Sequence, residues 1–219
     1  MVLCDLDGTL VDSVPDLAFS VNRMLESLDM ETHSEESIRH WVGNGVERLV
    51  KRALINELDG EPDLILYERA LPIFMDLYAA NNSGRSTVYP GVIEGLEGLR
   101  LQGMPMGCVT NKAERFTQPL LRDLGIDHFF DCVVCGDTLP VKKPDPAPLH
   151  YAADFFKVPS HRALMVGDSV NDVRAARAAG FQIVCVPYGY NHGQDIHIAE
   201  PDVVISGLQE LPHMLAKTA

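Results

Sequence analysis

Six short, almost continuously apolar runs set the strongest limit on how this chain can fold. Each run has four to six residues and is rich in Val, Ile, Cys and Met. Runs of this length are typical of strands that are buried on both faces of a parallel sheet. The predicted strands are Met1–Leu6, Met104–Val109, Asp131–Cys135, Ala163–Gly167, Gln182–Val186 and Asp202–Ile205.

Helical patterns separate the later runs. Ala113–Leu124 carries an apolar stripe and is followed by Gly125, a residue that commonly ends helices, and Val170–Ala179 is followed in the same way by Gly180. Two further helices are expected at Pro144–Phe156 and Leu208–Ala216. Strands that alternate with helices predict an α/β fold, a doubly wound, Rossmann-like parallel sheet.

One connection between strands is far too long for a simple crossover. About ninety residues separate Leu10 from Met104, whereas a dozen or more would suffice. Most of this segment is helical in pattern, with a capping box expected at Ser13 and Asp16 and amphipathic helices at Val46–Leu58 and Leu64–Tyr78. We therefore predict a core domain of residues 1–14 and 84–219 and an inserted α-helical cap domain of residues 15–83, built to close over a substrate.

Charge narrows the possible partners. The chain has 18 Lys and Arg against 31 Asp and Glu, a formal net charge of −13, which disfavours nucleic acid and anionic membranes. No apolar run reaches the roughly 20 residues of a membrane span, and the acidic start does not fit a signal peptide, so a cytoplasmic protein is expected. The pair Cys132 and Cys135 lies on a predicted strand and is interpreted as two buried thiols.

Two pairs of aspartates directly follow predicted strands. Asp5 and Asp7 lie in Asp5-Leu6-Asp7-Gly8-Thr9, and Asp168 and Asp172 follow the strand that ends at Gly167. A single aspartate there more often caps a helix, but in open α/β sheets ligands bind at the carboxyl ends of the strands. Four carboxylates gathered there would repel one another unless a hard cation lay among them. Oxygen ligands of this kind suit Mg²⁺.

Two more strand ends offer groups that suit an anion. Thr110 and Asn111 follow the second predicted strand and supply a hydroxyl and an amide, while Lys143 follows the third and supplies a positive charge. Each signal is weak alone, because Thr-Asn often starts a helix and Lys-Pro often lies in a loop. Together with the aspartates they predict a phosphate site.

These four segments, in this order, resemble the motifs of the haloacid dehalogenase superfamily. Asp5–Leu10 resembles its first motif, Thr110 its second, Lys143 its third and Gly167–Asp172 its fourth, and the inserted helices resemble its type-1 cap. The resemblance covers essentially the whole chain. Cys4 stands where the family often has Phe, which is a minor departure.

The resemblance implies a role for each residue. Asp5 would attack phosphorus and form an aspartyl-phosphate, and Asp7 would act as acid and then as base. Thr110 and Asn111 would hold phosphoryl oxygens, and Lys143 would neutralise Asp5 and the developing charge. Mg²⁺ would be ligated by Asp5, the carbonyl of Asp7 and Asp168, with Asp172 bound directly or through water. Asp7 favours a phosphate ester over a halide, because a halide leaves without protonation.

Substrate choice is expected to depend on the cap. Val42-Gly43-Asn44-Gly45, Ser13–Leu17 and Tyr89–Val92 resemble segments of the phosphoglycolate phosphatases of this superfamily. Gly43, Asn44 and Gly45 would let the backbone approach a very small substrate, unless they form a simple turn between helices. Arg48, which follows them, is the candidate for the carboxylate of 2-phosphoglycolate.

Several readings of the chain remain open at this point. The first is a Mg²⁺-dependent phosphatase for 2-phosphoglycolate, and a close alternative is a related phosphatase for pyrophosphate or a sugar phosphate. A β-phosphoglucomutase-type phosphomutase would use the same aspartates, and a catalytically silent binding protein would have no reason to keep buried like charges. In each enzymatic case the partner is a small phosphorylated metabolite, bound by a monomer or homodimer.

Overall fold

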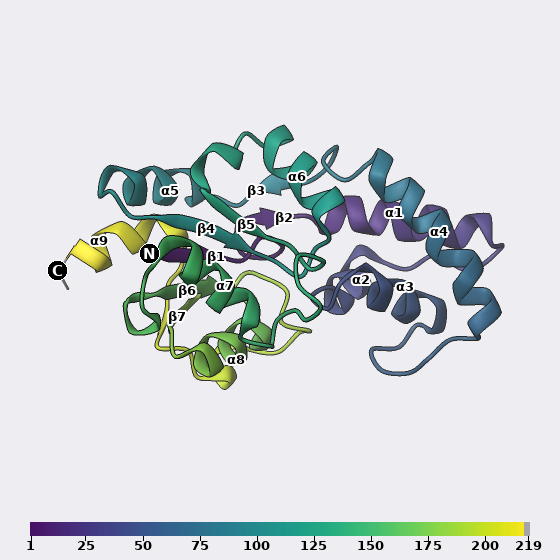
Figure 1. Ribbon diagram of the computed structural model, residues 1–219. Coiled ribbons are helices and arrows are strands. Elements are labelled where there is room, and N and C mark those ends of the chain that lie inside the picture. Colours follow the sequence, from purple (N-terminus) through teal and green to yellow (C-terminus); the bar gives the residue numbers. More distant parts are fainter. Residues whose placement is uncertain (217–219) are drawn as a thin grey trace.

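A six-stranded parallel sheet forms the centre of the computed structural model, which describes residues 1–216 (Figure 1). All six predicted strands are present and pair in parallel, so the prediction of a doubly wound α/β sheet is confirmed. In spatial order they are β5 (Cys132–Val134), β4 (Met106–Val109), β1 (Val2–Cys4), β6 (Leu164–Gly167), β7 (Gln182–Cys185) and β8 (Val203–Val204).

The two faces of the sheet are covered by different helices. Strand side chains alternate between the faces: Val2 and Cys4 belong to one apolar cluster and Leu3 belongs to the other. The first cluster packs against α5 (Val92–Leu101), α6 (Glu114–Asp123) and α9 (Leu211–Ala216). The second packs against α7 (Ala147–Phe156) and α8 (Val170–Ala179). Burial on both faces explains why the strand sequences are apolar throughout.

Four helices follow the first strand and gather at one end of the molecule, away from the sheet (Figure 1). They are α1 (Val14–Ser27), α2 (Glu35–Trp41), α3 (Val46–Ile55) and α4 (Leu64–Ala80). Their apolar faces form a third cluster, which also includes Phe116 from α6 and Tyr190. We refer to α1–α4 as the helical segment. The domain boundaries after residues 14 and 83 remain a prediction.

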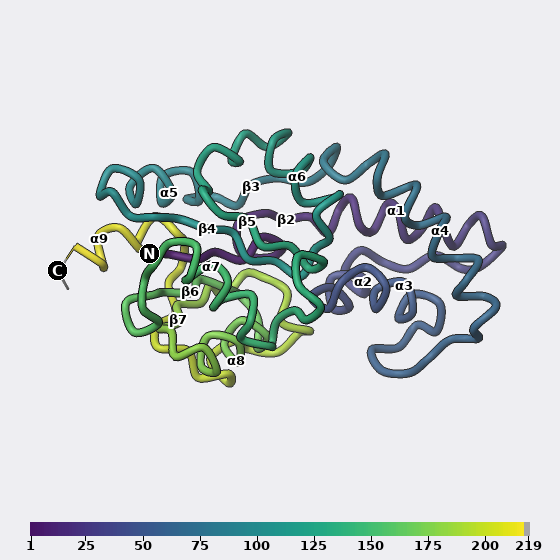
Figure 2. The backbone as a smooth tube through the Cα atoms, viewed as in Figure 1, coloured from purple at the N-terminus to yellow at the C-terminus, as the bar shows by residue number. Residues whose placement is uncertain are grey.

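The chain leaves and re-enters the sheet region side by side. The two crossings pair as a short antiparallel ladder of β2 (Val11–Asp12) and β3 (Thr87–Val88), which the sequence did not predict. Figure 2 follows both crossings between the sheet and the helical segment. Strands of two residues carry too little periodicity to be recognised from sequence.

Several local predictions need correction. No side-chain hydrogen bond from Ser13 caps α1, because the Ser13 hydroxyl donates to Asp7 and the Asp16 carboxylate accepts from Arg85 and Ser86. Helix α7 begins at Ala147 rather than Pro144, since Asp145 accepts a hydrogen bond from the Ala147 amide. Residues 208–210 form a 3₁₀ turn before α9, and α3 ends at Ile55.

The remaining expectations concern cysteines and membranes. All five cysteines are buried free thiols, including Cys132 and Cys135, as the sequence predicted. No helix within residues 1–216 combines the length and the apolar character needed to cross a bilayer.

Candidate active site

A pocket lies where the carboxyl ends of β1, β4 and β6 face the helical segment. It encloses about 580 Å³, its open mouth included. The sheet side is lined by ionisable and polar groups that follow the strands, and the helical side is lined by Leu17, Val42, Val46 and Leu49 with the backbone of Gly43 and Gly45. This is the edge at which open α/β sheets bind ligands.

Lys143 occupies the centre of the charged side. Its ammonium lies 2.8 Å from Oδ1 of Asp5 and 2.7 Å from Oδ1 of Asp172, and it also donates to the carbonyl of Val109 at 2.7 Å. These three partners match the three donors of a lysine ammonium. Burial lowers the pKa of Lys143, but the charges of Asp172 and Asp5 outweigh that effect and raise it above the ordinary value. The lysine therefore remains a fixed positive charge.

Of the two carboxylate oxygens of Asp5, Oδ1 is bound by protein donors and Oδ2 is available to react. Oδ1 accepts from the Leu6 amide at 2.7 Å as well as from Lys143. Burial raises the pKa of Asp5 to about 7, with Lys143 opposing the shift and Asp172 adding to it. Burial and the neighbouring carboxylates therefore outweigh the ammonium that contacts Asp5.

Asp168 is buried beside Asp5, and its pKa is shifted in the same direction. Its two oxygens accept from the Thr9 hydroxyl at 2.6 Å and from the Tyr190 amide at 2.6 Å. Burial, then the charges of Asp172 and Asp5, raise the pKa of Asp168 well above its ordinary value. Two glycines make room for it, since a Cβ added at Gly8 or Gly189 would lie 2.4 or 2.2 Å from its Oδ2.

Asp172 has both oxygens occupied by protein donors. Oδ1 binds Lys143, while Oδ2 accepts from the hydroxyl of Ser169 at 2.7 Å and from its amide at 3.1 Å, closing a capping box at the start of α8. Both oxygens of Asp172 are thus hydrogen-bonded, and its role as a metal ligand, directly or through water, stays a prediction.

The donor set and the charge count both fit a divalent cation. Oxygen atoms of Asp5, Asp168 and Asp172 lie within 4.8 Å of one another. Among the lining residues of the described part of the chain, four carboxylates face two ammonium groups, which leaves two negative charges uncompensated. All-oxygen ligands with excess negative charge suit Mg²⁺.

Asp7 faces the pocket, and both of its carboxylate oxygens have a protein donor. Oδ1 accepts from the Ser13 hydroxyl and from the ammonium of Lys112 at 2.9 Å, and Oδ2 accepts from the same ammonium at 3.2 Å. Lys112 is itself buried and donates to the hydroxyl of Tyr78 on α4. Sequence reasoning missed Lys112, although its place two residues after Thr110, at the same sheet edge, was a usable signal. Tyr78 gave no signal, because it lies in an ordinary apolar stripe.

Thr110 and Asn111 follow β4 into the pocket as predicted, but the Asn111 amide is already engaged. The Thr110 hydroxyl oxygen accepts from the Lys112 amide at 3.2 Å, which leaves its proton for another oxygen. The side-chain amide of Asn111 donates to the carbonyl of Lys143 at 2.9 Å and to that of Gly43 at 3.3 Å. Asn171 also donates to Gly43, at 3.4 Å. Both asparagines thus connect the helical segment to the sheet edge.

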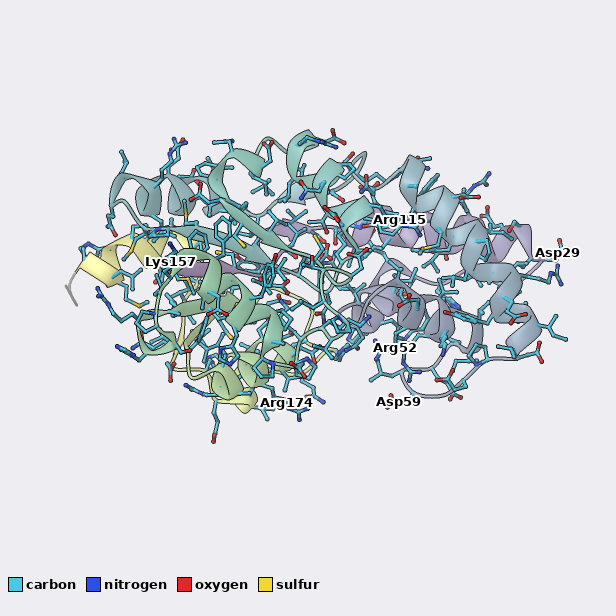
Figure 3. The ribbon with its side chains drawn as sticks, viewed as in Figure 1. Asp29, Arg52, Asp59, Arg115, Lys157 and Arg174 are labelled. Atoms are coloured by element: carbon cyan, nitrogen blue, oxygen red, sulfur yellow. The ribbon has the colours of Figure 1, made fainter. Side chains whose placement is uncertain are left out.

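Arg48 does not reach the pocket. Its guanidinium lies 3.1 Å from Glu61 and 3.4 Å from Asp59, and it donates to the carbonyl of Gly60 at 3.0 Å. Figure 3 draws Asp59 at the outer edge of the molecule. Among the predicted turn residues, Gly43 and Gly45 line the pocket and Asn44 does not. The prediction for Arg48 relied on its nearness in sequence, and the direction of α3 turns its side chain away.

Known proteins resemble this chain along its full length. Residues 2–186 match the family described as haloacid dehalogenase-like hydrolase. A phosphoglycolate phosphatase from Nitrosococcus oceani is 57% identical over 219 residues, which are 100% of this chain and 97% of that protein. One from Pseudomonas putida is 50% identical over 96% of this chain and 78% of its own length. The crystal structure of a predicted phosphoglycolate phosphatase from Haemophilus somnus has a TM-score of 0.92 at 36% identity, covering 98% of this chain and 97% of that one.

Proposed function

This chain belongs to the haloacid dehalogenase-like hydrolase family and is a phosphatase, and from that membership we propose that it hydrolyses 2-phosphoglycolate to glycolate and phosphate. The reaction uses Mg²⁺ and passes through an aspartyl-phosphate on Asp5. The observation that carries the proposal is the convergence of Asp5, Lys143 and Asp168 in one pocket, beside an Asp7 held ready for proton transfer.

Asp5 is the proposed nucleophile. Its Oδ1 is fixed by the Leu6 amide and Lys143, so attack on phosphorus falls to Oδ2. The new O–P bond forms as the bond from phosphorus to the bridging oxygen of the ester breaks. Thr110 has a hydroxyl proton to offer a phosphoryl oxygen, and Lys143 offsets the charge on Asp5 before and after the transfer.

Asp7 is the proposed proton carrier. It would give a proton to the alkoxide that leaves phosphorus, and then take one from the water that cleaves the aspartyl-phosphate. The Ser13 hydroxyl binds Oδ1 and Lys112 contacts both oxygens, and these contacts fix the direction of the carboxylate. A positioned acid of this kind contributes roughly 10²- to 10⁴-fold to the rate.

Asp5, Asp168 and the carbonyl of Asp7 are the proposed ligands of Mg²⁺, with Asp172 acting through Lys143 and through water. When bound, Mg²⁺ would supply the two positive charges that the aspartates lack and would draw phosphoryl oxygens toward Asp5. The raised pKa values of Asp5 and Asp168 are compatible with this assignment, because burial and neighbouring carboxylates disfavour their charged forms and a bound cation would offset both effects.

A small substrate is supported by the pocket's wall and by the relatives. The helical side of the pocket offers apolar side chains and the backbone of Gly43 and Gly45, which leaves little for a sugar to hydrogen-bond. The relatives from Nitrosococcus oceani and Pseudomonas putida are named phosphoglycolate phosphatase.

Initial rates over a panel of phosphate esters test the proposal. The panel holds 2-phosphoglycolate, pyrophosphate, glucose 6-phosphate and β-glucose 1-phosphate, each with Mg²⁺ and with EDTA. We expect 2-phosphoglycolate to have the highest kcat/KM, and both EDTA and Asp5→Asn to abolish turnover. Asp76→Asn, the same change at an exposed position of α4, is the matched control and should keep the parental rate. Another preferred ester would overturn the substrate, and an active Asp5→Asn would overturn the mechanism.

A further inference from the structure

The carboxylate of the proposed substrate needs a cation that the helical segment does not provide. The segment's basic residues nearest the Gly43–Gly45 turn are engaged elsewhere: Arg48 and Lys51 pair with Glu61, and Arg52 donates to the carbonyls of Leu58 and Trp41. Among the described residues, none of the pocket-lining side chains from this segment carries a positive charge. The cation must therefore come from the sheet side.

Two of the lysines in residues 1–216 line the pocket, and they differ in how their donors are used. Lys143 directs its ammonium to three separate groups, Asp5, Asp172 and the carbonyl of Val109. The ammonium of Lys112 donates to Tyr78 and to both oxygens of the Asp7 carboxylate, at 2.9 and 3.2 Å. Since an ammonium group has three donors, Lys112 can exchange the longer contact with Asp7 for another acceptor and leave none of its partners unpaired.

The surroundings of Lys112 strengthen any ion pair it makes. Its side chain is 2% exposed, and its ammonium lies 4.9 Å from the centre of the Tyr78 ring. Tyr78 packs in turn against Phe74 and Phe116, with ring centres 5.5 and 4.8 Å away. A cation in such an apolar, water-excluding wall interacts with an anion much more strongly than an exposed one does.

Lys112 also lies at the right distance from the reacting atoms. Asp7 must reach the bridging oxygen of the ester within roughly 3 Å to protonate it, and Lys112 lies 2.9 Å from Asp7. Its ammonium is therefore on the leaving-group side of the phosphate, at most about 6 Å from that oxygen. In 2-phosphoglycolate the carboxylate is separated from the bridging oxygen by a single methylene, so it falls within this range.

We propose that Lys112 binds the carboxylate of the leaving group and selects phosphate esters whose alcohol carries a negative charge one methylene from the ester oxygen. This assignment rests on the proposed function, because it presumes 2-phosphoglycolate as substrate. Tyr78 on α4 acts as a positioning residue, because its hydroxyl accepts a hydrogen bond from the Lys112 ammonium. In this proposal Lys112, in the loop after β4, recognises the substrate, and the helical segment covers the substrate with apolar side chains.

The test compares two esters of the same skeleton on the same protein sample. In 2-hydroxyethyl phosphate a hydroxymethyl group replaces the carboxylate of 2-phosphoglycolate. The ratio of the two kcat/KM values cancels any loss of folded protein, and it also cancels any damage to Asp7 that affects both esters. For Lys112→Met we expect the ratio to fall roughly 10- to 100-fold, the worth of one charge-assisted hydrogen bond.

Lys142→Met is the matched control. Lys142 precedes Lys143, is 40% exposed on its side chain and lies 3.8 Å from Glu47; its ammonium is close to Gly45, where an added Cβ would lie 3.1 Å from it, but Lys142 does not itself line the pocket. We expect this variant to keep the parental ratio. If Lys112→Met keeps the ratio while both rates fall, Lys112 only positions Asp7 and the proposal is overturned. A fall in the ratio for Lys142→Met alone would overturn it too.

A binding measurement covers the case in which Lys112→Met turns over neither ester. The probes are 3-phosphonopropionate, a non-hydrolysable isostere of 2-phosphoglycolate, and propylphosphonate, which lacks the carboxylate. Calorimetry with Mg²⁺ should show tighter binding of 3-phosphonopropionate to the parent protein and equal binding of both to Lys112→Met. A retained difference in the variant would contradict the proposal. If the parent itself favours neither 2-phosphoglycolate nor the carboxylated probe, the proposed function fails instead.

Discussion

The carboxylate of Asp16 lies 2.7 Å from both the backbone nitrogen and the hydroxyl of Ser86, seventy residues later in the chain. The Arg85 amide donates to the same carboxylate at 2.9 Å. Asp16 is near the start of α1, where the chain enters the helical segment, and Ser86 is just before β3, where the chain returns. A fully buried carboxylate thus joins the two crossings.

Replacing Asp16 should destabilise the protein severely. Asp16→Ala leaves the backbone amides of Arg85 and Ser86 without their acceptor, and each buried unsatisfied donor costs about 1–3 kcal/mol. We expect the free energy of unfolding to fall by about 3 kcal/mol or more in urea titrations. Asp76→Ala, at an exposed position of α4, should change it by less than about 0.5 kcal/mol. Equal stabilities of the two variants would show that the buried carboxylate contributes nothing.

Removing the charge of Asp5 should stabilise the metal-free protein at neutral and alkaline pH. The pKa of Asp5 is raised from 3.8 to about 7 in the folded state, so the folded protein binds the proton more tightly than the unfolded chain does. The parent therefore loses stability as the pH rises from about 4 to about 7, and Asp5→Asn does not. In EDTA the melting temperature of Asp5→Asn should exceed that of the parent. The difference should increase between about pH 4 and about pH 7 and stay constant at higher pH. Saturating Mg²⁺ should remove the difference. A difference that shrinks as the pH rises would refute the assignment.

A methyl group at position 189 should weaken metal binding. A Cβ there would lie 2.2 Å from Oδ2 of Asp168, so Gly189→Ala must displace that carboxylate. We expect the Mg²⁺ concentration for half-maximal activity to rise at least roughly tenfold, because moving one ligand is worth more than about 1.4 kcal/mol. The control is Gly84→Ala, where the added Cβ meets no atom closer than 3.8 Å. An unchanged Mg²⁺ requirement in Gly189→Ala would argue against Asp168 as a ligand.

Asp7→Asn should separate the two halves of the reaction. Acetyl phosphate has a leaving group that departs without a proton, whereas the alkoxide of 2-phosphoglycolate needs one. With acetyl phosphate we expect a rapid burst of about one acetate per Asp5, followed by turnover slowed roughly 10²- to 10⁴-fold, since water is no longer activated. With 2-phosphoglycolate the burst should disappear. Bursts of equal size with both compounds would exclude Asp7 as the acid, and rapid-quench measurements distinguish these outcomes.

Breaking the contact between α8 and the helical segment should affect substrate affinity more than chemistry. Asn171 donates to the carbonyl of Gly43 at 3.4 Å, parallel to the contact from Asn111. Loss of one hydrogen bond of this kind costs about 0.5–1.5 kcal/mol, so Asn171→Ala should raise KM for 2-phosphoglycolate roughly two- to tenfold with a smaller change in kcat. Steady-state kinetics decide this, and a change confined to kcat would contradict it.

The features that could be predicted from the sequence are the buried strands and the site residues that directly follow them. Val2–Cys4 and Leu164–Gly167 are recognisable because burial on both faces leaves no polar position, and Asp5, Asp168 and Lys143 converge because parallel strands end at one edge. Tyr78 and Gly189 could not be found in this way. Their importance comes from contacts with residues distant in sequence, Lys112 and Asp168, and nothing in their own neighbourhoods marks it. Arg48 was misplaced for the same reason, since sequence proximity does not determine which way a helical side chain points.

The position of Phe116 has a consequence for recombining such enzymes. Phe116 belongs to α6, a helix that covers one face of the sheet, yet its ring packs on Tyr78 and its carbonyl accepts from Asn82 at 2.7 Å. If residues 15–83 were replaced by those of a relative, Phe116 would stay while the side chains it packs against changed. The contact would then be overpacked or would contain a cavity. A chimaera that also exchanges residue 116 keeps this residue matched to the helices it packs against. The residues that must be exchanged together are therefore not continuous along the chain.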